Sequence, residues 1–186
     1  MNLYNLHNDP RSLHKHQEAH DTITDIIFDE IRKGKRINDR QLTALASNPD
    51  AGVVYAVKYL RGRFREAEPT IAKVALASYE YAEKAIERRF PAGEKAIASD
   101  PTVALLYARN VIEGPWPEGE KAIASHPMRA RSYALFVLKD KFPAGERAIS
   151  KEPSFVKQYN EMLEKKGYSN EDLIDVKKDI NKTFHP

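Results

Sequence analysis

Apolar and polar positions along the chain recur with a period of 26 residues. The phrase RFPAGEKAIASDPTVALLYARNVIEG at 89–114 is followed by PWPEGEKAIASHPMRARSYALFVLKD and then by KFPAGERAISKEPSFVKQYNEMLEKK. Repetition at a fixed period predicts stacked structural repeats, because each unit buries its apolar face against the next. The register gives five segments: 37–62, 63–88, 89–114, 115–140 and 141–166. A tyrosine occupies one column in all five, at Tyr55, Tyr81, Tyr107, Tyr133 and Tyr159.

Each repeat predicts one long and one short helix. Asp100-Pro101 combines an N-cap acceptor with a first-turn proline, and Ala104, Tyr107 and Val111 continue from it as one apolar stripe. The short helices begin with proline and carry a glutamate in the first turn, which suits the helix dipole. We expect three glycines to end the long helices: Gly62, Gly114 and Gly167. Three others are small enough to allow a neighbouring helix to approach closely: Gly93, Gly119 and Gly145.

The two ends of the chain predict capping helices. Residues 12–33 place four isoleucines on one face: Ile23, Ile26, Ile27 and Ile31. Residues 169–184 begin with SNED, which resembles a capping box. The expected fold is therefore all-α, a right-handed α-solenoid of five two-helix repeats at 37–166, with an N-terminal capping segment and helix at 1–36 and a C-terminal capping helix at 167–186.

Two resemblances follow from these motifs. The segment LTALASNPDAGVVYAVKYL at 42–60 resembles the leucine-rich variant and HEAT-like classes of α-solenoid. The phrase RFPAGEKAIASDPTVALLYARNVI at 89–112 is similar to helical repeats of proteins encoded by bacteriophages. The resemblance spans about 37–166 and implies an α-solenoid of phage origin, whose partner would be a bacterial host protein such as a defence factor. It implies no catalytic residues.

Composition narrows the class of protein without naming a partner. Apolar residues make up 41% and charged residues 31% of 186 residues, which is typical of a globular chain. The chain has no cysteine and a net charge of +3. The N-terminal sequence does not resemble a signal peptide, and no run approaches the roughly 18 apolar residues that a membrane span needs. We expect a cytoplasmic protein, in the host cell if phage-encoded, with no membrane partner.

Candidate chemical groups are few, and each has a structural interpretation. The recurrent glutamates Glu68, Glu94, Glu120 and Glu146 favour contacts to a tyrosine hydroxyl or an arginine of the same repeat, or helix capping, over cation binding. His16 and His20 lie four residues apart and could bind a metal together, but His14 does not share a face with His16 and no third ligand is specified, so a solvated helix face is the preferred interpretation. His126 precedes Pro127 as an expected cap. Neither a nucleophile motif nor a phosphate-binding loop occurs. We expect no enzymatic activity, cofactor or metal.

Two surfaces are candidates for binding a macromolecule. The outward face of the long helices, together with one aromatic, supplies apolar anchors for a protein partner: Leu106, Leu135, Phe136, Trp116, Val54 and Met162. The turns after the long helices supply a basic edge: Arg61, Arg63, Arg65, Arg88, Arg89, Lys139 and Lys141. A non-enzymatic scaffold that binds another protein is the expected function. The alternatives are a nucleic-acid-binding solenoid that uses the basic edge and a self-assembling structural protein.

Overall fold

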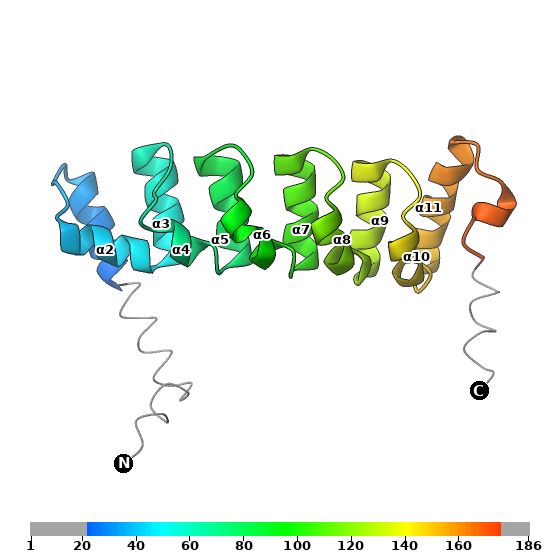
Figure 1. Ribbon diagram of the computed structural model, residues 1–186, viewed down its shortest axis with the longest axis horizontal. Helices are drawn as coiled ribbons and strands as arrows, with labels where there is room; N and C mark the ends of the chain where they lie inside the picture. Colours follow the sequence, from blue (N-terminus) through cyan, green and yellow to red (C-terminus); the bar gives the residue numbers. More distant parts are fainter. Residues whose placement is uncertain (1–21, 176–186) are drawn as a thin grey trace, which may run out of the picture. The chain divides into compact units, whose positions relative to one another are not determined.

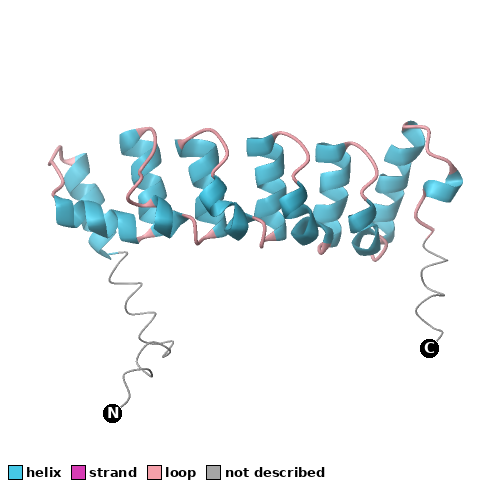
Figure 2. Cartoon of the chain, viewed as in Figure 1, coloured by secondary structure: helices cyan, strands magenta, loops and turns pink. Residues whose placement is uncertain are grey.

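The computed structural model describes residues 22–175, and within this range the regular secondary structure is entirely helical (Figure 2). Contacts divide the chain into two compact units, Met1–Ile71 and Ala72–Pro186. The boundary falls inside the second 26-residue segment. In the described part of the first unit, a helix at 22–32 is followed by α2 (Asp39–Ser47), α3 (Pro49–Tyr55), the π-helical segment η2 (Ala56–Leu60) and α4 (Glu68–Ile71).

The second unit alternates long and short helices. The long ones are α5 (Ala75–Glu80) with η3 (Tyr81–Ala85), α7 (Pro101–Tyr107) with η4 (Ala108–Ile112), α9 (Pro127–Tyr133) with η5 (Ala134–Leu138), and α11 (Pro153–Lys165). Each of α5, α7 and α9 packs against the next long helix (Figure 1). The short helices α6 (Pro91–Ile97), α8 (Pro117–Ala124) and α10 (Pro143–Ile149) lie between them along one edge. This is the repeat-like packing of neighbouring helices that the periodicity predicts.

Side-chain caps start the long helices where the sequence places Asx-Pro. The Asp100 carboxylate accepts hydrogen bonds from the backbone N–H groups of Thr102 and Val103 at 2.8 and 2.9 Å. Asn48 caps α3 in the same way through Asp50 and Ala51. These bonds satisfy amides that a helix leaves without intrahelical acceptors. His126 also stands at an N-cap position, but its side chain makes no capping hydrogen bond, contrary to the expectation.

The ends of the long helices differ from the prediction. Four of them finish in a residue with left-handed backbone, at intervals of 26: Arg61, Glu87, Glu113 and Lys139. The next N–H then bonds back over six residues, as from Gly114 to the Ala108 carbonyl at 3.1 Å, which closes a Schellman-type end. Gly62 and Gly114 therefore follow the left-handed residue instead of occupying it. Of the three glycines predicted to end long helices, Gly167 alone takes the left-handed conformation, with φ +88°.

The expected close approach between helices is confirmed at a pair of small residues. A Cβ added at Gly145 would lie 2.9 Å from Ala130 Cβ, and one added at Gly119 would lie 3.3 Å from Ala104 Cβ. In the first unit the glycine lies on the long helix and the alanine takes the place of the later glycines. A Cβ added at Gly52 would lie 2.9 Å from the Cβ of Ala67. The short helices thus lie close to the preceding long helices, and a small side chain occupies each contact: Ala104 against Gly119, Ala130 against Gly145, and Ser78 against Gly93.

The chain ends agree with the predicted caps in part. The helix at 22–32 buries Ile27 and stacks Phe28 on Tyr59, with ring centroids 5.8 Å apart. Ile23 and Ile26 remain 47% and 55% exposed, so the four isoleucines do not form one buried face. At the other end the predicted capping box at Ser169 is present, but it starts only the 3₁₀ turn η6 (Asn170–Asp172), and residues 173–175 are not helical. Within 169–175 the structure shows this short 3₁₀ helix in place of the first turns of the predicted helix, and 176–184 lie outside the described residues.

Candidate interaction surface

The recurrent tyrosine, glutamate and aromatic residues form one hydrogen-bonded group in each of the three repeats between 89 and 166. Tyr107 is fully buried, and its hydroxyl donates to the Glu94 carboxylate at 2.8 Å and accepts from the Phe90 backbone N–H at 2.9 Å. Its ring packs on Trp116 of the next repeat, with centroids 4.9 Å apart. Tyr133 and Tyr159 repeat both hydrogen bonds. Glu94, Glu120 and Glu146 therefore have a structural role, as expected, because each carboxylate accepts a hydrogen bond from a tyrosine of its own repeat.

Charge within this group is neutralised locally. Arg89 forms two hydrogen bonds to Glu94 at 2.8 and 2.9 Å, and Arg63 pairs with Glu68 in the same way. The Arg89 guanidinium holds the pKa of the Glu94 carboxyl below its ordinary value, against the opposing effect of burial. Burial is also the main reason that the pKa of Tyr107 lies above that of a free tyrosine. A carboxylate committed to these partners has little capacity left for an external cation.

Trp116 is a correction to the predicted anchors. Its side chain is 1% exposed, and it lies over Tyr107 and against the space that Gly119 leaves open. Its backbone N–H donates to the Tyr133 hydroxyl at 2.8 Å. The residue belongs to the aromatic column that links successive repeats, and its indole cannot contact a partner without unfolding the repeat. The sequence register contained this signal, because Phe90 and Phe142 occupy the equivalent positions.

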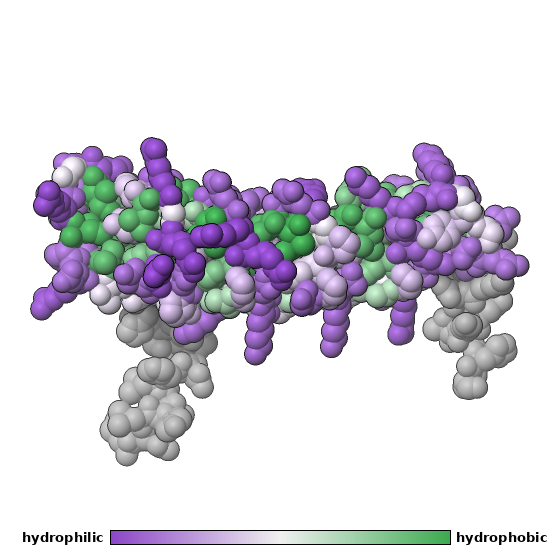
Figure 3. Space-filling model, turned by 45° about the horizontal axis from the view of Figure 1, so that its top comes forward, coloured by the Kyte–Doolittle hydropathy of each residue, from purple (hydrophilic) through white to green (hydrophobic). Residues whose placement is uncertain are grey.

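Phe136 is the predicted anchor that the structure leaves most accessible. It lies in η5 and is 56% exposed, whereas Val54, Leu106, Leu135 and Met162 are half-buried. Equivalent positions of the second unit carry Lys84, which pairs with Glu80, and Asn110, which donates to Tyr79 and Glu83. In the part of the chain that the structure describes, no aromatic ring stacks on Phe136. Figure 3 shows apolar surface in separate areas among hydrophilic side chains.

Much of the predicted basic edge is engaged within the protein. Besides the Arg63 and Arg89 pairs, Lys141 lies 3.3 Å from Asp172. Three edge residues are exposed and, among residues 22–175, make no ion pair within 4.0 Å: Arg61, Arg65 and Arg88. Lys139 is exposed as well, and its carbonyl accepts a hydrogen bond from Lys166 at 2.8 Å. The acidic residues Glu87 and Glu113 occupy the equivalent left-handed positions between these cations. The edge therefore carries charges of both signs.

The remaining candidate groups have structural roles or lie outside the described range. His14, His16 and His20 fall among residues 1–21, which are not described. Between residues 22 and 175, no cluster of three or more histidine, aspartate or glutamate side chains is arranged to hold a metal. Ser99 and Ser125 donate to the backbone carbonyls of Ala96 and Ala122 at 2.6 Å, so both hydroxyls are engaged at helix ends.

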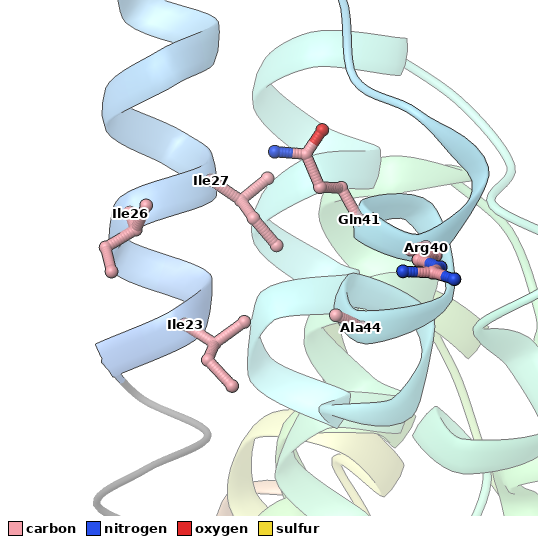
Figure 4. Close-up of a pocket in the computed structure, with 6 residues that line it drawn as sticks. All are labelled: Ile23, Ile26, Ile27, Arg40, Gln41 and Ala44. Carbon is pink, nitrogen blue, oxygen red and sulfur yellow. The ribbon is translucent and has the colours of Figure 1, made fainter.

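The first unit has a shallow apolar pocket beside its N-terminal helix. The pocket has a volume of about 290 Å³ and is lined by Ile23, Ile26, Ile27, Arg40, Gln41 and Ala44. In Figure 4, Ile23 and Ile27 point from the helix at 22–32 toward α2, whereas Ile26 lies on the other side of the same helix. Gln41 is held by the Glu30 carboxylate, to which it donates at 2.6 Å. The pocket is a consequence of the two partly exposed isoleucines noted above.

Comparison with known proteins produced no match among family models, curated proteins or solved structures. Within residues 22–175, no helix has the length and apolar character needed to cross a membrane.

Proposed function

We propose that the protein is a right-handed α-solenoid of five two-helix repeats that acts as a non-enzymatic scaffold and binds another protein. The observation that carries this proposal is the exposure of Phe136 in a column that accepts polar side chains elsewhere. Burying the exposed half of a phenylalanine removes roughly 100 Å² from water, which stabilises a complex by about 2.5 kcal/mol. This is the size of contribution made by an interface hot spot.

The surroundings of Phe136 support an interface with an apolar centre and a charged rim. Leu135 precedes it in η5, and Met162 occupies its column in the last repeat; both are half-buried and retain some accessible surface. The charged residues Lys139 and Glu161 lie near these positions in the sequence and are exposed. Charged residues at a rim contribute mainly to the rate and specificity of association, so Phe136 provides the principal anchor.

The class of partner follows from the resemblance of the repeats to phage-encoded proteins. On that ground we propose a bacterial host protein, such as a defence factor, that the scaffold blocks. A second copy of this chain is the competing partner, because an exposed phenylalanine also promotes self-association. Light scattering across a concentration series distinguishes the two, since a binder of host proteins stays monomeric when alone.

The decisive experiment compares Phe136→Asp with Leu76→Asp in affinity capture from bacterial lysate followed by mass spectrometry. Leu76 is a matched control, because it is 53% exposed and lies at a different position of the repeat. Phe136→Asp is expected to remove at least nine-tenths of the captured protein, whereas Leu76→Asp retains it, with helical content and melting temperature unchanged in both. Equal capture by wild type and Phe136→Asp would overturn the assignment of the anchor.

A further inference from the structure

A second surface lies on the short helices of the second unit. Lys95, Lys121 and Arg147 occupy the same position of α6, α8 and α10, 26 residues apart, and all three are exposed. The residue before each is the glutamate that accepts a hydrogen bond from the tyrosine hydroxyl, at 2.8 to 2.9 Å in all three repeats. Because this bond fixes the same turn of each short helix, the three cations leave their repeats at equivalent places. We call these three residues the cationic row.

The cationic row extends from the exposed side of the short helices. In Figure 3, hydrophilic side chains extend at regular intervals from the lower edge of the molecule. The other exposed residues of α6, α8 and α10 are one proline in each helix, followed by Ala92, Glu118 and Ala144. Packed helices are spaced 8–10 Å apart, so three cations on successive repeats span about 20 Å.

The row is not neutralised within the described chain. None of its members forms an ion pair within 4.0 Å among residues 22–175, in contrast to Arg63, Arg89 and Lys141 of the basic edge. One exposed carboxylate, Glu118, lies three residues before Lys121. All three cations lie in the last turn of their short helices, where a positive charge suits the helix dipole. The same placement leaves the three side chains exposed to solvent, where an external anion can reach them.

We infer that the cationic row binds the phosphate backbone of double-stranded nucleic acid without sequence preference. Three cations in a line complement a linear polyanion, since about 20 Å corresponds to about six base-pair steps of a strand at 3.4 Å each. Single strands are bound largely by stacking on aromatic rings, and α6, α8 and α10 contain no aromatic residue. Backbone contacts to a duplex are the chemistry that this surface can supply.

The test measures binding of a 20-base-pair duplex by fluorescence anisotropy between 50 and 200 mM KCl. Three neutralised phosphates predict a slope of about −2.7 for log K against log salt concentration, which weakens binding about 40-fold over this range. The triple variant Lys95→Gln, Lys121→Gln, Arg147→Gln is expected to bring the slope close to zero. The control Arg61→Gln, Arg88→Gln, Lys139→Gln changes the basic edge by the same net charge and is expected to keep the wild-type slope.

Each other result overturns the inference. Absence of wild-type binding at 50 mM KCl, or equal loss in both triple variants, would mean that the row is not a site. Loss in the edge variant alone would move binding to the basic edge. Tighter binding of a single-stranded oligonucleotide, or of phosphatidylserine vesicles at the same salt concentration, would replace the duplex as the ligand. The Phe136→Asp capture experiment is independent of these measurements, so failure of either proposal leaves the other standing.

Discussion

The contact between short and long helices makes Gly145→Ala a direct test of the repeat packing. A Cβ at this position would meet the Phe142 ring, with Cε1 at 2.6 Å, and the methyl group of Ala130 at 2.9 Å. Real Cβ atoms do not approach carbon this closely, so α10 must move away from α9. Overpacking of a core costs about 1–3 kcal/mol, whereas replacing a helical glycine with alanine returns about 0.5–1 kcal/mol. The net expectation is a loss of about 1–2 kcal/mol.

The measurement is thermal unfolding followed by circular dichroism at 222 nm. For a chain of this size, 1 kcal/mol shifts the melting temperature by about 2–4 °C, so Gly145→Ala is expected to lower it by about 5 °C. Gly114→Ala is the matched control, because an added Cβ there meets nothing within 4 Å and its φ is not positive. The control is expected to melt within about 2 °C of wild type.

A compensating change sharpens the test. The first unit uses the reverse pair, Gly52 against Ala67, at the equivalent contact. The double variant Ala130→Gly, Gly145→Ala copies that arrangement and is expected to recover part of the lost stability, although the contact with Phe142 remains. A Gly145→Ala protein that melts above wild type would show that helix propensity outweighs packing, and would refute the proposed close approach.

Two further predictions concern the tyrosine column. Tyr133→Phe removes the hydroxyl that accepts a hydrogen bond from the buried backbone N–H of Trp116. This substitution is expected to lower the free energy of unfolding in urea by about 1–3 kcal/mol. The Tyr55 hydroxyl forms no hydrogen bond among residues 22–175, so Tyr55→Phe is expected to change the free energy of unfolding by less than about 0.5 kcal/mol. Equal effects of the two substitutions would contradict this assignment. Burial also raises the pKa of Tyr79 to about 12, and those of Tyr107 and Tyr133 further. A tyrosine whose pKa is higher in the folded than in the unfolded chain contributes its full stabilisation below the unfolded-state pKa, which is near 10. The melting temperature should therefore fall as the pH rises beyond about 10. A melting temperature that stays constant up to about pH 11.5 would contradict this prediction.

The sequence predicted those features of the fold that depend on recurrent packing. The Asp100-Pro101 cap, the small residue at Gly145 and the buried tyrosines each have one dominant local or nearest-neighbour cause, so one column of letters indicates the contact. The left-handed helix ends were missed because Glu87, Glu113 and Lys139 are not residues that favour that conformation. The left-handed conformation is stabilised by the hydrogen bond that the following N–H donates back to the helix. This hydrogen bond depends on the geometry of the whole turn.

Surface predictions depend on what covers each position, and periodicity does not report this. A single tryptophan where the other repeats carry phenylalanine resembles a binding anchor in the sequence, and this is why Trp116 is among the predicted anchors. Its column is nevertheless the buried aromatic one. The prediction of the basic edge rests on the positions of the cations and does not consider their ion-pair partners. Arg63 and Arg89 each form an ion pair with a glutamate five residues later in the chain. The cationic row was missed for the opposite reason, since lysines inside a recurrent short helix resemble part of the framework.

The distinction between framework and surface can be argued from the columns themselves. Tyr107 is fixed at three points, two through its hydroxyl and one through its ring, so replacing it would disturb both its own repeat and the next. The column of Phe136 contains a lysine and an asparagine at equivalent places, so packing does not demand an apolar side chain there. An exposed aromatic ring at a position that tolerates polar residues lowers the solubility of the protein and adds no packing to the fold. Packing within the fold therefore does not account for the ring of Phe136, and this is the reason that we propose it as the anchor for a protein partner.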